Sequence, residues 1–162
     1  MSKLLKTPIC KPEKWLIEAA AEIGLDFSEL THEMTNEFIS HTIKQHGDTN
    51  SEKARGQLPI TYSEFELLPD IVRNPNSVII GAAKYGKIIN AYLKRNICSS
   101  IIYIEEVLCS KKNKALRSKT MYKKVGMVSD DIFFKIVSNN ANTDVSKAKI
   151  VVGTGGNPGG EV

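Results

Sequence analysis

The sequence has few cysteines, no long apolar run and no signal for export, and each absence excludes a class of protein. The three cysteines, Cys10, Cys98 and Cys109, are odd in number and form no C-x-x-C pair, so we expect reduced thiols rather than disulfides or a zinc site. No apolar run approaches the roughly 20 residues of a membrane helix. The N-terminus has no apolar segment of the kind found in signal peptides. These absences predict a cytoplasmic location.

What the sequence does contain is typical of one globular domain with an uneven charge. Hydrophobic residues make up 41% of the chain and charged residues 25%, enough for a buried core over 162 residues. Residues 84–124 hold 11 lysines and arginines but only two acids, a local charge of +9 against +4 for the whole chain. This asymmetry predicts a polyanion such as a nucleic acid as partner. A solvated, lysine-rich edge of a sheet is the alternative.

The first part of the chain carries the signals of helices. A proline in the first turn and a glycine after the last turn predict a helix over 12–23. Asp26 and Glu29 form a possible capping box, which predicts a second helix that ends before Gly47. Residues 47–58 are polar and predict a loop. A further capping box, Thr61 with Glu64, predicts a short helix through Leu68.

The second half of the sequence changes to the pattern of strands. Runs rich in isoleucine, valine and tyrosine are separated by turn signals, which predicts an antiparallel meander. The predicted strands are Ser77–Ala82, Lys87–Lys94, Cys98–Leu108 and Lys114–Lys124. Residues 130–137 fit a short helix or a fifth strand, and residues 153–162 are glycine-rich, as in a flexible tail. Helices followed by such a sheet predict an α+β fold.

A short polar segment, residues 41–61, concentrates groups that can move protons and stabilise charge. It holds His41, His46, Glu52, Arg55 and Gln57. A base, an acid, a fixed cation and an amide are the groups that cleavage of a phosphodiester requires. The two histidines are five residues apart, whereas paired metal ligands on a helix prefer a spacing of four, so we expect no metal site here.

Position along the predicted helix assigns different roles to the two histidines. His41 follows Met34 by seven residues and so shares the core-facing side, which suits a base beside a cleft; a satisfied core histidine is the alternative. His46 lies in the last turn, where the helix dipole favours the imidazolium and therefore the acid role or phosphate binding. A cation that only caps the helix is the alternative. Arg55 suits phosphate contact or an ion pair with Glu52, which could itself be the base or could orient Arg55.

The last predicted strand places further polar groups on one face. Thr120, Tyr122 and Lys124 alternate along it, and a hydroxyl, a phenol and an ammonium suit contacts with RNA. Ordinary strand composition explains threonine and tyrosine equally well. Gln57 also has two readings: contact with phosphate or a base edge, or a hydrogen bond that fixes the loop.

Four motifs follow one another between residues 41 and 123: H-T-I-K-Q-H-G, E-K-A-R-G-Q-L-P-I-T, L-P-D-I-V-R-N-P-N-S-V and S-K-T-M-Y-K. With them, residues 30–124 resemble the phage-type nucleases of the barnase–EndoU–colicin–RelE-like superfamily. The resemblance implies small, usually metal-independent ribonucleases, found as phage-encoded domains and as toxins of bacterial competition proteins. It also implies N-terminal helices packed on a four- to five-stranded, mainly antiparallel sheet.

The resemblance implies a division of the chain and a set of site residues. We expect a helical extension over 1–25, a nuclease domain over 26–137 and a flexible tail over 138–162. The implied catalytic residues are His41, His46, Glu52, Arg55, Gln57 and Thr120. The expected RNA-binding residues are Lys87, Lys94, Arg95, Arg117, Lys119, Tyr122 and Lys124.

The expected activity is metal-independent cleavage of RNA, with tRNA as a candidate substrate and with no cofactor. The 2′-hydroxyl of the RNA would attack the neighbouring phosphate. RNA is the expected partner, and a toxin of this kind would also have an acidic immunity protein over its basic face. The alternative, from a different class, is a non-catalytic nucleic-acid-binding or structural module of a phage or mobile element, which would bind without turnover.

Overall fold

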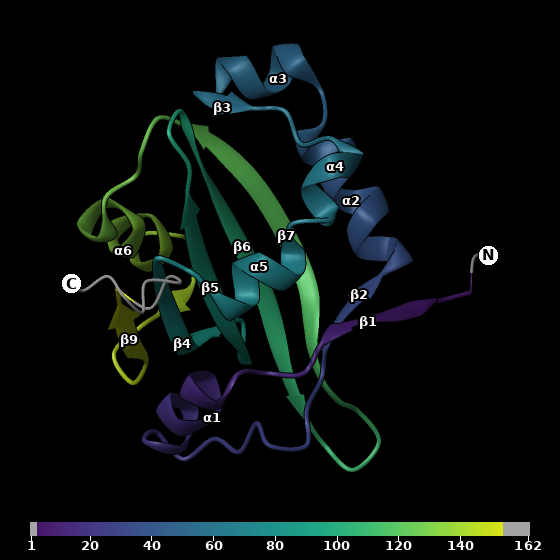
Figure 1. The fold of residues 1–162 in the computed structure, drawn as a ribbon, viewed down its shortest axis with the longest axis vertical. Helices are drawn as coiled ribbons and strands as arrows, with labels where there is room; N and C mark the ends of the chain where they lie inside the picture. Colours follow the sequence, from purple (N-terminus) through teal and green to yellow (C-terminus); the bar gives the residue numbers. More distant parts are fainter. Residues whose placement is uncertain (1–2, 154–162) are drawn as a thin grey trace.

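The computed structural model describes residues 3–153, which form one large, mostly antiparallel sheet with helices packed on it (Figure 1). The strands are β1 (Lys6–Cys10), β2 (His32–Thr35), β3 (Gln57–Leu58), β4 (Ser77–Lys84), β5 (Lys87–Arg95), β6 (Ser99–Cys109), β7 (Lys114–Val125), β8 (Thr143–Asp144) and β9 (Lys149–Val152). The helices are α1 (Lys14–Ala21), α2 (Asn36–His46), α3 (Thr49–Ala54), α4 (Tyr62–Phe65), α5 (Leu68–Arg73) and α6 (Asp130–Ser138). No helix within these residues is long and apolar enough to cross a membrane.

The centre of the sheet is the meander β4–β5–β6–β7, in which each strand is antiparallel to the next. This confirms the four strands predicted from the sequence. The remaining strands extend the meander on both sides. On one side β7 pairs with β2 in parallel and β2 with β1 antiparallel, while β8 and β9 both pair with β4 on the other side. The short strand β3 also pairs with β7, beyond β2.

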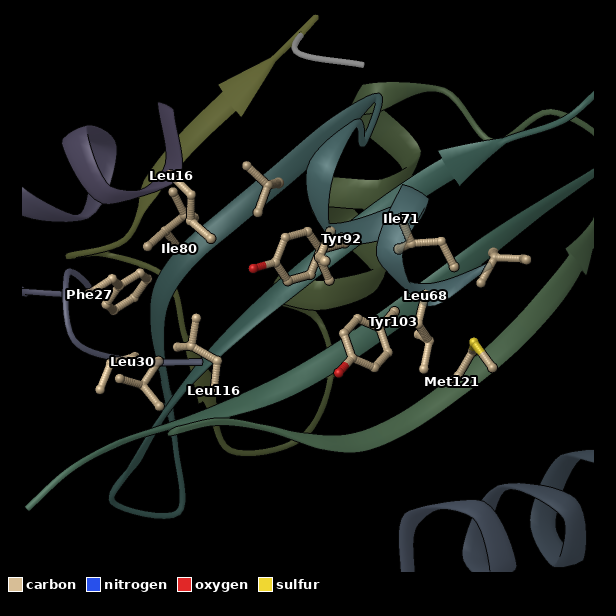
Figure 2. Close-up of a cluster of buried hydrophobic side chains, with 14 of the residues drawn as sticks. Leu16, Phe27, Leu30, Leu68, Ile71, Ile80, Tyr92, Tyr103, Leu116 and Met121 are labelled. Atoms are coloured by element: carbon tan, nitrogen blue, oxygen red, sulfur yellow. The ribbon is translucent and has the colours of Figure 1, made fainter. Parts of the chain in front are cut away.

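Alternate side chains of the meander enter two separate apolar cores. Figure 2 shows the larger one, where Leu16 of α1 lies beside Ile80 of β4, and Leu68 of α5 lies beside Tyr103 of β6. The smaller core lies on the other face, where α6 contributes Phe133 among its buried side chains. Because both faces are covered, the central strands contain continuous apolar runs, such as residues 78–80 of β4 and 101–104 of β6.

A polar network is buried within the sheet. His32 of β2 and Glu105 of β6 are both fully buried, and the His32 Nδ1 lies 2.8 Å from the Glu105 Oε1. Asn90 and Tyr92 of β5 donate hydrogen bonds to the other carboxylate oxygen, at 2.9 and 2.5 Å. Burial, with the Glu105 charge beside it, raises the pKa of Tyr92 well above its ordinary value. The network joins three strands of the sheet, so its role is structural.

The predicted helix from Asp26 to residue 46 is wrong in its first half. Asp26 accepts hydrogen bonds from the N and Oγ of Ser28 and closes a turn. Residues 32–35 form β2, and α2 begins only after Thr35, whose Oγ1 accepts a hydrogen bond of 3.0 Å from the Phe38 N. Hydrogen bonding to β1 and β7 outweighs the helical periodicity of residues 32–35. The sequence of these four residues does not indicate which strands they pair with.

Residues 47–58 are not the simple loop that their polarity predicts. Asp48 caps α3 by accepting a 2.8 Å hydrogen bond from the Ser51 N, and β3 follows directly. The two readings of residues 130–137 are resolved in favour of a helix, since Ser129 caps α6 in the same way. The capping box predicted for Thr61 and Glu64 is present at the start of α4.

The α+β class is confirmed, but the detailed architecture differs from the prediction. The sheet has nine strands within the described residues instead of four or five. The helices are not gathered at the N-terminus, because β1 precedes all of them and α6 follows β7. The division at residues 25 and 137 stays a prediction, although β1, β8 and β9 from the outer segments all join the central sheet. The end of the predicted tail, residues 154–162, lies outside the described residues.

Candidate functional site

The turn between α2 and α3 folds a carboxylate back onto a histidine. Gly47 ends α2, and the short helix α3 then brings Glu52 to the side chain of His46. The His46 Nδ1 lies 3.1 Å from the Glu52 Oε1, with the carboxylate fully buried and the His46 side chain 14% exposed. An ionised carboxylate can only accept, so Nδ1 carries the proton and Nε2 is left as the nitrogen that can exchange one.

Arg55 completes this group but is already engaged. Its Nη2 lies 2.5 Å from the Glu52 Oε2 and donates a 2.6 Å hydrogen bond to the Gln45 carbonyl. The contact with Glu52 is an ion pair that lacks hydrogen-bond geometry. The Glu52 Oε2 therefore has no hydrogen-bond partner among the described residues. The ion-pair reading of Arg55 is therefore the one that the structure has, and the guanidinium chiefly neutralises Glu52.

Two further predicted residues reach this group from β3 and β7. The ring of Tyr122 lies 5.6 Å from that of His46, between centroids, with the planes tilted by 31°. Burial raises the pKa of Tyr122 to about 12, so its phenol keeps its proton at neutral pH. Gln57 pairs with Lys124 across the strands, and its buried Oε1 has no hydrogen-bond partner among the described residues. The structure thus gathers His46, Glu52, Arg55 and Tyr122, and Gln57 lies on β3, two residues after Arg55.

His41 does not lie in the core, contrary to the prediction. The buried stripe of α2 consists of Phe38 and Thr42, and His41 is turned from Thr42 by about 100° into an exposed position. There it borders a pocket of about 500 Å³ together with Lys87, Arg117 and Lys119. The prediction failed because Met34, from which the seven-residue spacing was counted, lies in β2, and α2 begins only at Asn36.

Thr120 borders a second hollow, of about 210 Å³, on the neighbouring part of the sheet. The two hollows adjoin, because both are lined by Lys87, Glu106 and Lys119. Sequence reasoning missed Glu106 and also Tyr85, which borders the smaller hollow. Glu106 could have been noticed as one of only two acids in the basic stretch, whereas the segment around Tyr85 was interpreted only as a turn.

Six of the 11 basic side chains in residues 84–124 are paired with carboxylates of the same protein. The pairs, at 2.6–3.5 Å between nitrogen and oxygen, are Lys94–Asp70, Arg95–Asp130, Lys114–Glu29, Arg117–Glu33, Lys119–Glu106 and Lys123–Glu64. Lys87 and Lys124 have no such ion pair within residues 3–153. The local charge of the sequence therefore overstates the free positive charge, because most partners come from outside the basic stretch.

The candidate site thus has two parts, which α2 and β7 connect. One part is the closed group around His46, and the other consists of the adjoining hollows bordered by His41, Thr120 and lysines. Within residues 3–153, no three histidine, cysteine, aspartate or glutamate side chains gather as metal ligands would. Imidazoles and a buried carboxylate can transfer protons, and the lysines that border the hollows can balance negative charge.

The family comparison identifies this class. The model of the family described as phage-Barnase-EndoU-ColicinE5/D-RelE like nuclease3 matches residues 11–130, so the chain belongs to this family of nucleases. The match confirms the resemblance drawn from the sequence motifs. It begins directly after β1 and ends at the first residue of α6, and so includes most residues of both parts of the candidate site. No curated protein and no solved structure matches the chain.

Proposed function

We propose that the protein is an endoribonuclease that cleaves RNA by attack of the 2′-hydroxyl on the adjacent phosphate, with tRNA as a candidate substrate. The observation that carries the proposal is the His46–Glu52 pair, 3.1 Å between Nδ1 and Oε1, on the same helix α2 that carries His41 to the lysine-lined pocket. A carboxylate that fixes one ring nitrogen orients the other for proton transfer. Residues in this arrangement perform the reaction without a metal ion or a cofactor.

In the proposed reaction, His46 and His41 exchange protons with the two oxygens that react. The Nε2 of His46 takes the proton of the 2′-hydroxyl, and the oxygen forms a bond to phosphorus. The bond from phosphorus to the 5′-oxygen breaks, and His41 donates a proton to that oxygen. Lys87, which has no ion-pair partner within the described residues, stabilises the phosphorane charge. The products are a 2′,3′-cyclic phosphate and a 5′-hydroxyl. These roles reverse the assignment from the helix dipole alone, because Glu52 orients His46 as the base.

A cytoplasmic site of action and an acidic immunity protein belong to the same proposal. Lys87 and Lys124 have no ion-pair partner within the described residues, so an acidic partner could cover them. The alternative function, nucleic-acid binding without turnover, is favoured by one observation. Arg55 is held by Glu52 and by a backbone carbonyl, so it would have to be freed before it could contact phosphate.

The test is incubation with total RNA in the presence of EDTA, followed by mapping of the new ends. We expect cleavage that survives the chelator and leaves cyclic phosphate ends. His46→Ala serves as the control for a contaminating nuclease. Cleavage that stops with EDTA and returns with a divalent ion would overturn the metal-independent reaction, and tight RNA binding without any cleavage would support the alternative function.

A further inference from the structure

The hairpin between β4 and β5 turns through an unusual residue. Lys84 and Lys87 are the last paired residues, so Tyr85 and Gly86 form a two-residue turn. Both have positive φ, 51° and 76°, which is the geometry of a type I′ turn. Asparagine or glycine is the usual residue at the first of these positions, and a bulky side chain there strains the backbone. A strained residue that is retained points to a use for its side chain.

The side chain of Tyr85 lies beside a hollow with apolar and charged walls. The side chain is 70% exposed and borders the hollow of about 210 Å³. The wall is apolar at Ile89 and Ile104. Three lysines border it, Lys84, Lys87 and Lys119, together with Glu106, which lies 3.5 Å from Lys119. An exposed aromatic ring among lysines is the arrangement that binds single-stranded nucleic acid, in which bases stack on the ring and phosphates meet the cations.

We propose that Tyr85 and the hollow beside it form a nucleobase-binding subsite for single-stranded RNA. The inference rests on the proposed function, because it identifies where a nucleotide next to the cleaved phosphate binds. Lys87 and Lys119 border both this hollow and the pocket of His41, so one strand can lie across the two. Stacking uses the face of any base, so the subsite binds single-stranded RNA with little sequence preference.

Affinity for an RNA that cannot be cleaved tests the subsite directly. A labelled 2′-O-methyl oligonucleotide lacks the attacking hydroxyl, and its fluorescence anisotropy reports binding alone. We expect Tyr85→Ala to weaken binding about 5- to 150-fold, the range for loss of one stacked base. Tyr85→Phe keeps the ring and should stay within about twofold of the wild type. Tyr62→Ala is the matched control, since Tyr62 is 69% exposed but lies on α4 and borders neither hollow.

Removal of single bases from the oligonucleotide locates the contact. The wild-type protein should lose affinity when one particular base is absent, whereas Tyr85→Ala should bind the intact and the abasic oligonucleotides equally well. Binding by Tyr85→Ala within about twofold of the wild type would overturn the subsite. A loss that persists with every abasic oligonucleotide would also overturn it, because Tyr85 would then contact the backbone.

Stability provides a second, independent measurement. Asparagine tolerates positive φ, so Tyr85→Asn should melt about 2 to 4 °C higher than the wild type while it loses the same affinity as Tyr85→Ala. A lower melting temperature would contradict the claim that the tyrosine is kept at a cost to the fold. Failures of the two proposals are distinguishable. If the protein cleaves RNA but its affinity does not depend on Tyr85, only the proposed subsite is wrong. If binding depends on Tyr85 but no RNA is cleaved, only the proposed nuclease activity is wrong.

Discussion

Two histidine–glutamate pairs in this protein have almost the same contact but different surroundings. In each, Nδ1 of the histidine meets Oε1 of the glutamate, at 2.8 Å for His32–Glu105 and 3.1 Å for His46–Glu52. His32 is fully buried, and its Nε2 has no hydrogen-bond partner among the described residues. His46 lies at the end of a helix with part of its side chain exposed. Of these two histidines, only His46 is accessible to solvent, as the proposed proton transfer requires.

The partners of each carboxylate extend the difference. Glu105 accepts hydrogen bonds from Asn90 and Tyr92, neutral groups of the sheet, so its position is fixed from several strands. Glu52 is balanced by Arg55, whose side chain is 44% exposed and belongs to the same short helix segment. The histidine–glutamate contact alone does not distinguish a structural pair from a candidate catalytic pair. Exposure of the histidine side chain to solvent distinguishes the two.

Glu105→Ala should have the largest effect on stability. The substitution leaves His32, Asn90 and Tyr92 without their acceptor inside the sheet, and removal of one partner of a buried pair costs about 3 to 5 kcal/mol. For a chain of this length, the melting temperature should fall by about 6 to 20 °C. RNA cleavage per folded molecule, measured well below that temperature, should be unchanged. A variant that melts normally would show that the network is not structural.

His46→Ala should show the opposite pattern. We expect cleavage to fall by a factor of about 10² to 10⁴, the usual contribution of a general acid or base, with stability within about 1 kcal/mol of the wild type. Glu52→Gln tests orientation and should lower the rate less, because the imidazole itself remains. Melting curves and initial cleavage rates are the two measurements. An early-melting His46→Ala variant with full specific activity would assign both histidine pairs to structure.

Arg55→Ala tests whether Arg55 stabilises the fold by balancing the charge of the buried Glu52. On sequence grounds alone this loop arginine should matter little for stability. In the structure its loss leaves the fully buried Glu52 charge with only His46 as partner, so we expect a cost of about 1 to 3 kcal/mol. Arg55→Lys is the matched control, since it keeps the charge. Equal melting temperatures for the wild type and Arg55→Ala would show that Arg55 does not stabilise the fold through Glu52.

The smallest effect concerns a carboxylate nearer the surface. Burial would raise the pKa of Glu64, but hydrogen bonds from Lys123 and Thr61 outweigh it and hold that pKa below its ordinary value. The pair therefore stabilises the fold above the pKa of the unfolded chain, near 4.5, and this contribution disappears as the pH falls through the folded pKa. Glu64→Gln should melt below the wild type at pH 7 and level with it at pH 3. A difference that persists at pH 3 would rule out the charge as its cause.

Local signals in the sequence were enough for the meander and for several helix ends. The strands around Tyr92 and Tyr103, and the capping box of Thr61, follow from spacing and residue type, which are properties of short segments. The strand at His32–Thr35 could not be found this way. Its partners are Lys6–Cys10 and the start of β7, and neither is close to it in sequence.

The candidate site was predicted in composition better than in geometry. The polar segment did bring His46, Glu52 and Arg55 together, because all three lie within ten residues and one turn joins their helices. It could not show that His41 is exposed, since that depends on where α2 begins. The pairing of Lys94 and Arg95 with acids of other segments was equally invisible, because charge counts do not record contacts.

The pairing of β9 with β4 affects how the protein is made. The four residues Lys149–Val152 lie antiparallel to Ser77–Ile80, some 65 residues behind the end of β4 in order of synthesis. At ribosomal rates of about 5 to 20 residues per second, β4 waits roughly 3 to 13 s for that partner. During this interval the outer edge of β4 exposes unpaired backbone N–H and C=O groups, which can pair with a strand of another chain. A chain whose synthesis stops before residue 149 therefore keeps this unpaired edge strand. We expect such a chain to aggregate unless a chaperone binds it or a protease degrades it.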